Sequence, residues 1–270
     1  MCRLPRRCDR MNLAVDAWGW LQRELDAWDE RGLRADFWWR DDDAVAASPQ
    51  LERLLKISER HAVPAALAVI PAGLQPSLVT QLRDYPRLSV LQHGYSHQSH
   101  AAPGQRKLEL GGNCHDEQMQ TELRRGQKIL REHFGQRFNA VLVPPWNRID
   151  DRIQQALPTL GFTGVSAMRV RKNAWPAARL LQVNTHLDPI NWRHRRGFIG
   201  IYPAIAILVQ HLVARRTGYR DMDEPTGILS HHLVQNEAVW RFIDDLFRFL
   251  GHHPASGWVE AAEIWPVSPR

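Results

Sequence analysis

The chain has 270 residues, of which 44% are hydrophobic, and a formal net charge of +6. This length allows one large α/β domain or two small ones, and it is sufficient to bury a full core. Three cysteines without a CxxC spacing exclude a disulfide framework and indicate a reducing compartment.

Two further classes are excluded. Residues 1–11 are basic, but no apolar stretch follows them, so they predict a disordered leader and not a secretory signal. The most apolar run, residues 198–213, is shorter than the ~20 residues that a membrane helix needs, so we expect a core helix and no membrane span. We therefore expect a cytoplasmic protein with a single domain over residues 12–270.

Helices and strands alternate along the predicted domain. A helical spacing of apolar residues predicts a helix over 12–31, and Ser48 is placed to cap the next one. The further predicted helices cover residues 77–83, 116–134, 150–160 and 237–250. The predicted strands cover residues 37–39, 65–70, 88–91, 140–143, 165–167, 181–183 and 227–230. This alternation implies an α/β fold with a largely parallel sheet.

Residues 101–113 are rich in Gly, Lys and Arg and predict a mobile loop. Most of the polar residues discussed below directly follow a predicted strand. In a β/α barrel, that is the face on which the active site forms.

Three consecutive acids, Asp41, Asp42 and Asp43, follow the strand predicted over 37–39. Carboxylates this close repel one another, so either a cation lies nearby or a pKa is raised. A metal ion would supply the cation, whereas a capped turn after the strand is the alternative.

His93 and His97 follow the strand predicted over 88–91. Two histidines four residues apart can point the same way from one helical turn. Together with a carboxylate from another strand end, they would form a triad that suits zinc and other divalent metals. Three protein ligands leave coordination positions open, as in a catalytic site.

Pro144 and Pro145 fix the backbone after the strand predicted over 140–143. This stiffness can hold the amide of Trp146 as a donor toward a developing oxyanion. An ordinary strand-to-helix turn is the alternative.

His231 and His232 follow the last predicted strand. A histidine that faces an activated water is a natural general acid. Leu229 and His231 share one face of the strand, and Ser230 and His232 share the other, so only one histidine can face the site. We favour His231, and a core or capping histidine is the alternative.

The loop residues Asp188 and Trp192 are further candidates. Trp192 would form an apolar wall against a small group such as a methyl, and Asp188 would orient another site residue. Loop packing explains both equally well.

Taken in order, these segments resemble the polysaccharide deacetylases, the fourth carbohydrate esterase family, over residues 37–233. The resemblance implies a distorted, seven-stranded β/α barrel that removes acetyl groups with the help of a metal. In that family an Asp-Asp pair supplies a catalytic base and then a metal ligand. The match makes Asp42 the base and Asp43 the ligand, although three consecutive acids leave the register open by one residue.

The same resemblance makes His93 and His97 the other metal ligands. It assigns the role of oxyanion donor to the backbone amide of Trp146 and the role of general acid to His231. Zinc is the expected ion, with Co²⁺, Ni²⁺ and Mn²⁺ as alternatives. The expected substrate-binding residues are Trp39, Pro145, Arg148, Asp188 and Trp192.

Two departures from the family pattern stand out. Gly94 occupies a position where many members have Ser or Thr, and Val143 replaces an arginine that orients the catalytic Asp. Arg40 and Arg148 are the candidates to replace that arginine. These departures indicate a divergent branch.

We therefore expect a metal-dependent hydrolase that removes an acetyl group from an N-acetylated or O-acetylated sugar, or from a soluble or lipid-linked glycan precursor. A catalytically impaired member that binds a glycan or a partner is the first alternative, motivated by Val143. A basic nucleic-acid-associated protein is the second. The arginines are scattered without a binding motif, so we expect no specific nucleic-acid partner. The sugar and the oligomeric state stay open.

Overall fold

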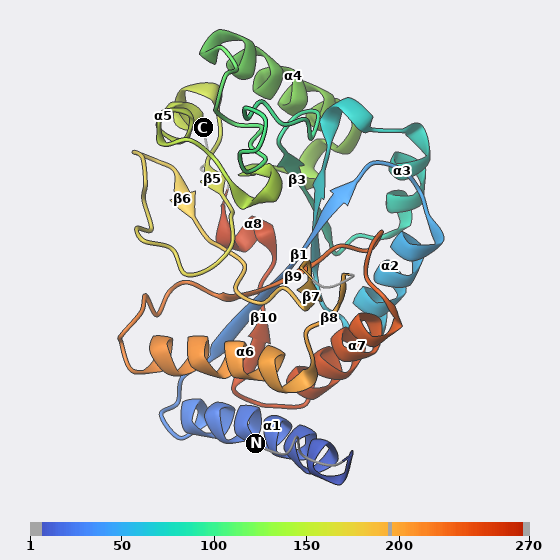
Figure 1. Ribbon diagram of the computed structural model, residues 1–270, viewed down its shortest axis with the longest axis vertical. Helices are drawn as coiled ribbons and strands as arrows, with labels where there is room; N and C mark the ends of the chain where they lie inside the picture. The colour runs from blue at the N-terminus through green and yellow to red at the C-terminus, as the bar shows by residue number, and fades with distance from the viewer. Residues whose placement is uncertain (1–6, 194–195, 267–270) are drawn as a thin grey trace.

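The computed structural model describes residues 7–193 and 196–266, and a sheet of parallel strands lies at its centre (Figure 1). The sheet has the order β10-β1-β2-β3-β4-β5-β6, and β9 also pairs with β1. Its strands are β1 (Ala35–Ala44), β2 (Ala65–Val69), β3 (Leu88–His93), β4 (Phe138–Val143), β5 (Gly164–Val165), β6 (Leu181–Gln182), β9 (Thr226–Ser230) and β10 (Ser256–Trp258). A separate antiparallel pair joins β7 (Ile190–Asn191) to β8 (Gly197–Phe198).

The sheet curls into a distorted barrel. The segment after β6 reaches β9 through a parallel bridge between Leu187 and Ile228, so β9 contacts β1 as well as the far side of the sheet. The seven strands β1 to β6 and β9 thus surround one interior. The predicted α/β fold with a distorted seven-stranded barrel is confirmed.

Helices cover the outside of the sheet, and Figure 1 shows α1 lying alongside α6. The α-helices are α1 (Arg7–Asp29), α2 (Pro49–His61), α3 (Pro76–Gln81), α4 (Asp116–Phe134), α5 (Asp151–Ala156), α6 (Ile201–Arg216), α7 (Glu237–Gly251) and α8 (Ala261–Ile264). Short 3₁₀ turns are η1 (Pro71–Gly73), η2 (Leu82–Asp84), η3 (Gly135–Arg137), η4 (Pro145–Asn147) and η5 (Leu157–Leu160). As predicted, Ser48 caps α2, since its side chain accepts a hydrogen bond from the Leu51 amide at 3.0 Å.

An apolar cluster fills part of the interior of the barrel. Trp38 of β1 packs edge-to-face on Trp265, which follows α8, with their ring centroids 5.4 Å apart. Small and branched side chains complete this layer: Ala66, Ala68, Leu91, Val141, Val143, Val183 and Ala261. Along β1, the buried polar residues Arg40 and Asp42 lie nearer the carboxyl end of the strand than Trp38 does.

The boundaries differ from the predictions in a few places. Strand β1 extends through the acidic run to Ala44, and β3 includes His93. Helix α1 begins at Arg7, so residues 7–11 of the predicted leader are helical, and residues 1–6 lie outside the described residues. The division into a leader and one domain stays a prediction. Strand β10 and helix α8 had no counterpart among the predicted elements.

The loop predicted to be mobile, residues 101–113, is anchored at its end. Leu110 is buried and forms a bridge with Ile149, and its carbonyl accepts a hydrogen bond from the Asp150 amide at 2.9 Å. This part of the loop is therefore attached to the segment that leads from β4 into α5.

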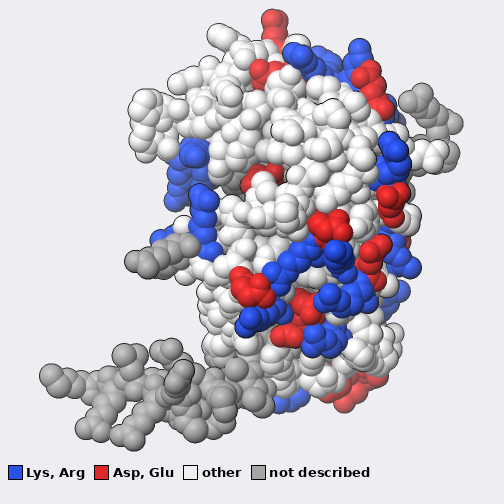
Figure 2. All heavy atoms as spheres, turned by 90° about the vertical axis from the view of Figure 1, so that its right-hand side faces the viewer, with Lys and Arg blue, Asp and Glu red and all other residues white. Residues whose placement is uncertain are grey.

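Basic and acidic side chains are interspersed on the face that carries α2, α3 and α7, as Figure 2 shows. Between α2 and α7, Arg53 pairs with Glu237 and Arg60 pairs with Asp244. Exposed pairs of this kind contribute little stability, and they neutralise the positive charge locally. Within the described ranges, every helix is too short or too polar to cross a bilayer.

Candidate metal centre

A bulge near the end of β1 brings two neighbouring carboxylates into the site. In a regular strand, adjacent side chains point to opposite faces. Here the register of β1 against β2 shifts between Asp41 and Ala44, and Asp43 has a left-handed backbone with φ 74°. Because a bulge redirects side chains, Asp43 can share the interior with Asp42.

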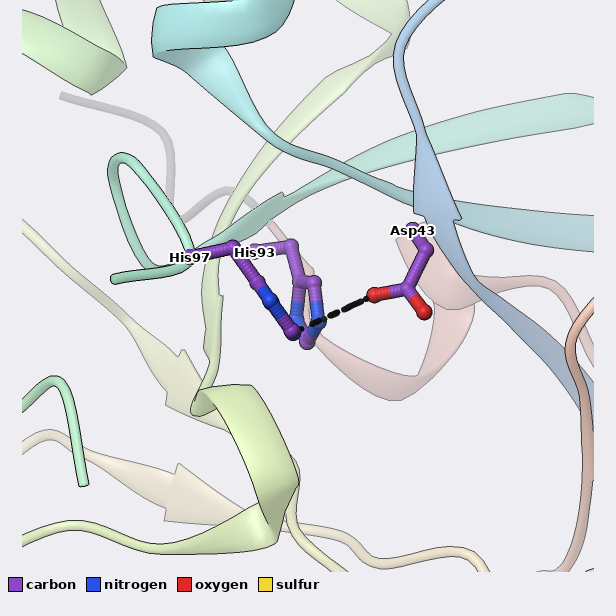
Figure 3. Close-up of side chains that lie close together, drawn as sticks. All are labelled: Asp43, His93 and His97. Carbon is purple, nitrogen blue, oxygen red and sulfur yellow. Dashed lines mark hydrogen bonds and ion pairs between the residues drawn. The ribbon is translucent and has the colours of Figure 1, made fainter. Parts of the chain in front are cut away.

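Asp43, His93 and His97 point toward one another at the carboxyl ends of β1 and β3 (Figure 3). The Asp43 Oδ1 lies 3.1 Å from the His93 Nε2 and 3.4 Å from the His97 Nε2. Ligand atoms at about 2.0–2.2 Å from a tetrahedral zinc lie about 3.3 Å from each other. The three side chains therefore fit a divalent metal, and the sequence prediction that they converge holds in the structure.

The Nδ1 of His93 donates a hydrogen bond to the Val143 carbonyl at 3.0 Å, so the ring directs its Nε2 at Asp43. Such an outer partner sets which nitrogen of a metal-binding imidazole is free. Burial alone would lower the pKa of His93, but the hydrogen bond that His93 donates to Asp43 and the charges of Asp42 and Asp43 raise it. Conversely, burial would raise the pKa of Asp43, but the hydrogen bond and charge of His93 hold it well below its usual range.

Of the two arginines expected to orient Asp42, Arg40 is the one that contacts it. Its guanidinium binds both oxygens of Asp42, from Nε at 2.9 Å and from Nη2 at 3.0 Å, and both residues are buried. It also donates to the Ser166 Oγ and the Asn147 Oδ1, each at 2.8 Å. Arg148, the other candidate, instead donates to the Lys107 carbonyl.

Asp41 lies on the opposite side of β1 and binds the end of β9. Its Oδ2 accepts hydrogen bonds from the Ser230 Oγ at 2.6 Å and from the His232 amide at 3.0 Å, and its Oδ1 binds the His232 ring. This leaves Asp42 and Asp43 as the two acids of the site. It also places Ser230 and His232 together, as the strand alternation predicted, with His231 on the other face.

His231 lies against Trp192. The two rings meet edge-to-face with centroids 4.8 Å apart, and the buried Nδ1 of His231 has no hydrogen-bond partner among the described residues. Asp188 accepts hydrogen bonds from the Trp192 Nε1 at 2.6 Å and the Ile190 amide at 2.9 Å, and burial raises its pKa. Asp188 thus positions Trp192, and Trp192 positions His231.

Trp146 also borders the triad. Its ring centroid lies 4.5 Å from that of His97, and its backbone is left-handed with φ 55°. The Nζ of Lys107 lies over the same ring at 5.4 Å. Pro145 is buried beside Gly94.

Trp39 does not lie at the site. It is 1% exposed, packs on Phe247 at a centroid distance of 4.8 Å and donates from Nε1 to the Ser230 Oγ. The prediction that Trp39 contacts a substrate is wrong, because strand alternation directs its side chain into the core between the sheet and α7.

Glu109 is a site residue that the sequence reasoning missed. It is 1% exposed, and its carboxylate binds the backbone amides of Tyr95, Ser96 and His97. Burial raises its pKa. One feature of the sequence could have pointed to Glu109. It is the only acid between Asp84 and Asp116, and it lies between two leucines, which favours a buried carboxylate.

A scan of the chain against family models matches residues 41–165 to the family described as polysaccharide deacetylase. No curated protein matches the chain.

Solved structures share the fold at low sequence identity. One is the Bc1960 peptidoglycan N-acetylglucosamine deacetylase, with TM-score 0.56 and 12% identity over 87% of this chain and 90% of that one. Another is a family 4 acetyl xylan esterase from Clostridium thermocellum with a cobalt ion, with TM-score 0.53 and 16% identity over 85% and 89%. A third is a mutant of BA3943, a CE4 family pseudoenzyme with restored activity, with TM-score 0.54 and 12% identity over 86% and 68%.

Proposed function

We propose that this chain, a distant relative of the polysaccharide deacetylase family, is a metal-dependent hydrolase that removes an acetyl group from a carbohydrate. One observation carries the proposal: Asp43, His93 and His97 converge beside Asp42, a second carboxylate that lies outside the triad. A metal site with a neighbouring base is what hydrolysis of an amide or ester by water requires.

Asp43, His93 and His97 would hold the ion. When bound there, a divalent metal supplies Lewis-acid polarisation of the acetyl carbonyl and makes water more acidic. Oxygen and imidazole ligands suit zinc and also cobalt, nickel or manganese.

Asp42 is the proposed general base. Arg40 binds both of its oxygens and keeps the carboxylate in one orientation, and each oxygen retains a lone pair that can accept a proton from water. The backbone N–H of Trp146 is the proposed donor to the tetrahedral oxyanion.

His231 is the proposed acid that protonates the leaving nitrogen or oxygen. Trp192 packs against it and is 46% exposed, so its remaining surface is available to a sugar or to an acetyl methyl. Arg148 and Asp188 stay candidate substrate contacts, and the cytoplasmic location stays a prediction.

The test is release of acetate by the full chain from acetylated chitooligosaccharides, peptidoglycan and acetyl xylan. We expect release with Zn²⁺ or Co²⁺, loss with a chelator and loss in Asp42→Asn. No release from any of these substrates with either ion would count against the proposal.

A catalytically impaired protein that binds a glycan is the second candidate, because Val143 replaces the family arginine and a relative of this fold is described as a pseudoenzyme. The Arg40–Asp42 pair argues against impairment, because Arg40 orients Asp42 in place of the arginine that Val143 replaces. Glycan binding that is equal in the wild type and in Asp42→Asn, without acetate release, would favour it.

A further inference from the structure

We infer that Glu109 is a positioning residue for the metal ligand His97 and that it acts through the backbone of residues 95–97. This inference rests on the proposed metal site. The Glu109 Oε1 accepts hydrogen bonds from the amides of Tyr95 at 2.8 Å and Ser96 at 2.9 Å, and its Oε2 accepts one from the His97 amide at 3.0 Å.

The loop between the two histidines needs an acceptor from outside. Strand β3 ends at His93, and the backbone turns through left-handed conformations at Gly94, φ 51°, and His97, φ 58°. Consecutive amides around such a turn point inward together and form a concave group of donors. A carboxylate can satisfy several such donors at once with strong, charge-assisted hydrogen bonds.

Gly94 and Glu109 depend on each other sterically. A Cβ on residue 94 would lie 2.5 Å from the Glu109 Oε2 and 2.6 Å from the Pro145 Cγ. The carboxylate therefore occupies the space that a side chain at position 94 would need. This explains the glycine at a position where the family resemblance led us to expect Ser or Thr.

Glu109 is itself held in place. The next residue, Leu110, bridges Ile149, and Lys107 contacts the ring of Trp146. The loop that carries Glu109 is therefore attached to the segment that follows β4. Through Glu109, the position of His97 is coupled to that of the proposed oxyanion donor.

The test compares Glu109→Gln with the wild type, with Glu117→Gln as the matched control. The control removes the same charge from an exposed position on α4. Glutamine keeps the shape of the side chain, but its NH₂ group would face one of the backbone donors. We expect Glu109→Gln to weaken Co²⁺ binding about 10–100-fold in calorimetric titration and to change the visible Co²⁺ spectrum, because outer partners orient ligands.

Hydrogen exchange of the Tyr95, Ser96 and His97 amides in the metal-free protein gives a second readout. We expect protection in the wild type and in Glu117→Gln, and loss of protection in Glu109→Gln. If Glu109→Gln does not fold, Gly94→Ala crowds both the Glu109 carboxylate and Pro145 while it keeps every charge, and it should weaken Co²⁺ binding in the same way.

Wild-type Co²⁺ affinity in the folded Glu109→Gln or Gly94→Ala variant, or unprotected amides in the wild type, would overturn the role of Glu109 alone. A wild type that binds no Co²⁺ would overturn both this inference and the proposed function. A normal titration together with no acetate release would leave the inference supported and count against the proposed function only.

Discussion

Among the described residues, two clusters each bring two histidines and an acid within 4.8 Å. One is Asp43, His93 and His97 at the barrel mouth, and the other is the buried group of His186, His211 on α6, and Glu224. Their hydrogen bonds differ. The Nδ1 of His93 donates to the Val143 carbonyl, which leaves its Nε2 free to bind a metal once deprotonated.

In the second cluster the Nδ1 of the histidine accepts a hydrogen bond instead of donating one. The Nδ1 of His186 accepts a hydrogen bond from the Gly227 amide at 2.9 Å, so a neutral ring carries its proton on Nε2. That proton blocks the nitrogen that faces Glu224 at 3.6 Å. The rings of His186 and His211 stack with centroids 3.5 Å apart, so this cluster is better explained as buried neutral packing. Proximity alone does not make a metal site, because the outer hydrogen bonds decide which nitrogen has a free lone pair.

The largest expected effect concerns the base beside the first cluster. Asp42→Asn removes the proton acceptor and should lower acetate release about 10²–10⁴-fold, the usual contribution of general base catalysis. Steady-state rates at saturating Co²⁺ measure it. Unchanged Co²⁺ affinity in the same variant is the control, and an active Asp42→Asn would contradict the assignment.

Metal binding distinguishes the two clusters directly. His97→Ala should weaken Co²⁺ binding by at least about 100-fold, beyond the loss expected for an outer partner. His211→Ala should leave both affinity and stoichiometry unchanged, since we expect one ion per chain. Calorimetric titration of both variants checks this. A second bound ion that His211→Ala removes would show that the tautomer argument for His186 is wrong.

Arg40→Lys tests how the base is oriented. Lysine cannot form the bidentate contact to Asp42, so acetate release should fall about 10–100-fold while Co²⁺ affinity stays unchanged. The thermal melting curve shows whether the variant is folded. Full activity in a folded Arg40→Lys variant would remove Arg40 from the site.

The smallest expected effect is on stability in acid, and it comes from the second cluster. Burial, and next the charges of His186, Arg215 and Arg220, lower the pKa of His211 to about 2 from its ordinary 6.5. The unfolded chain therefore takes up this proton first as the pH falls. The stability that the protein gains from a neutral His211 is therefore fully present above pH 6.5. Below that pH, the free energy of unfolding falls by at most about 1.4 kcal/mol per pH unit.

Melting temperatures between pH 7.5 and 5 measure this loss. His211→Gln should show a shallower decline than the wild type, because the group that titrates on unfolding is gone. Parallel curves for the two proteins would mean that other residues govern stability in this range.

The sequence by itself determined the alternation of strands and helices and the segments that meet at the site. Apolar periodicity and turn residues are local, so strands such as β2 and helices such as α4 could be predicted closely. The positions of Asp43, His93 and His97 after strands also predicted their convergence, because parallel strands place their carboxyl ends at one mouth of the barrel.

Only the tertiary structure decided the finer arrangement. The β1 bulge turned Asp43 to the side of Asp42, away from Asp41. Arg40 lies two residues before Asp42 on the same strand, and contacts across the barrel with Ser166 and Asn147 hold it against that acid, whereas Arg148 binds Lys107. Trp39 lies in the core, and Glu109 binds the backbone amides of residues 95–97, a loop that precedes it in the chain. Each of these outcomes depends on a backbone distortion or on a contact between segments distant in sequence, and local residue patterns carry neither.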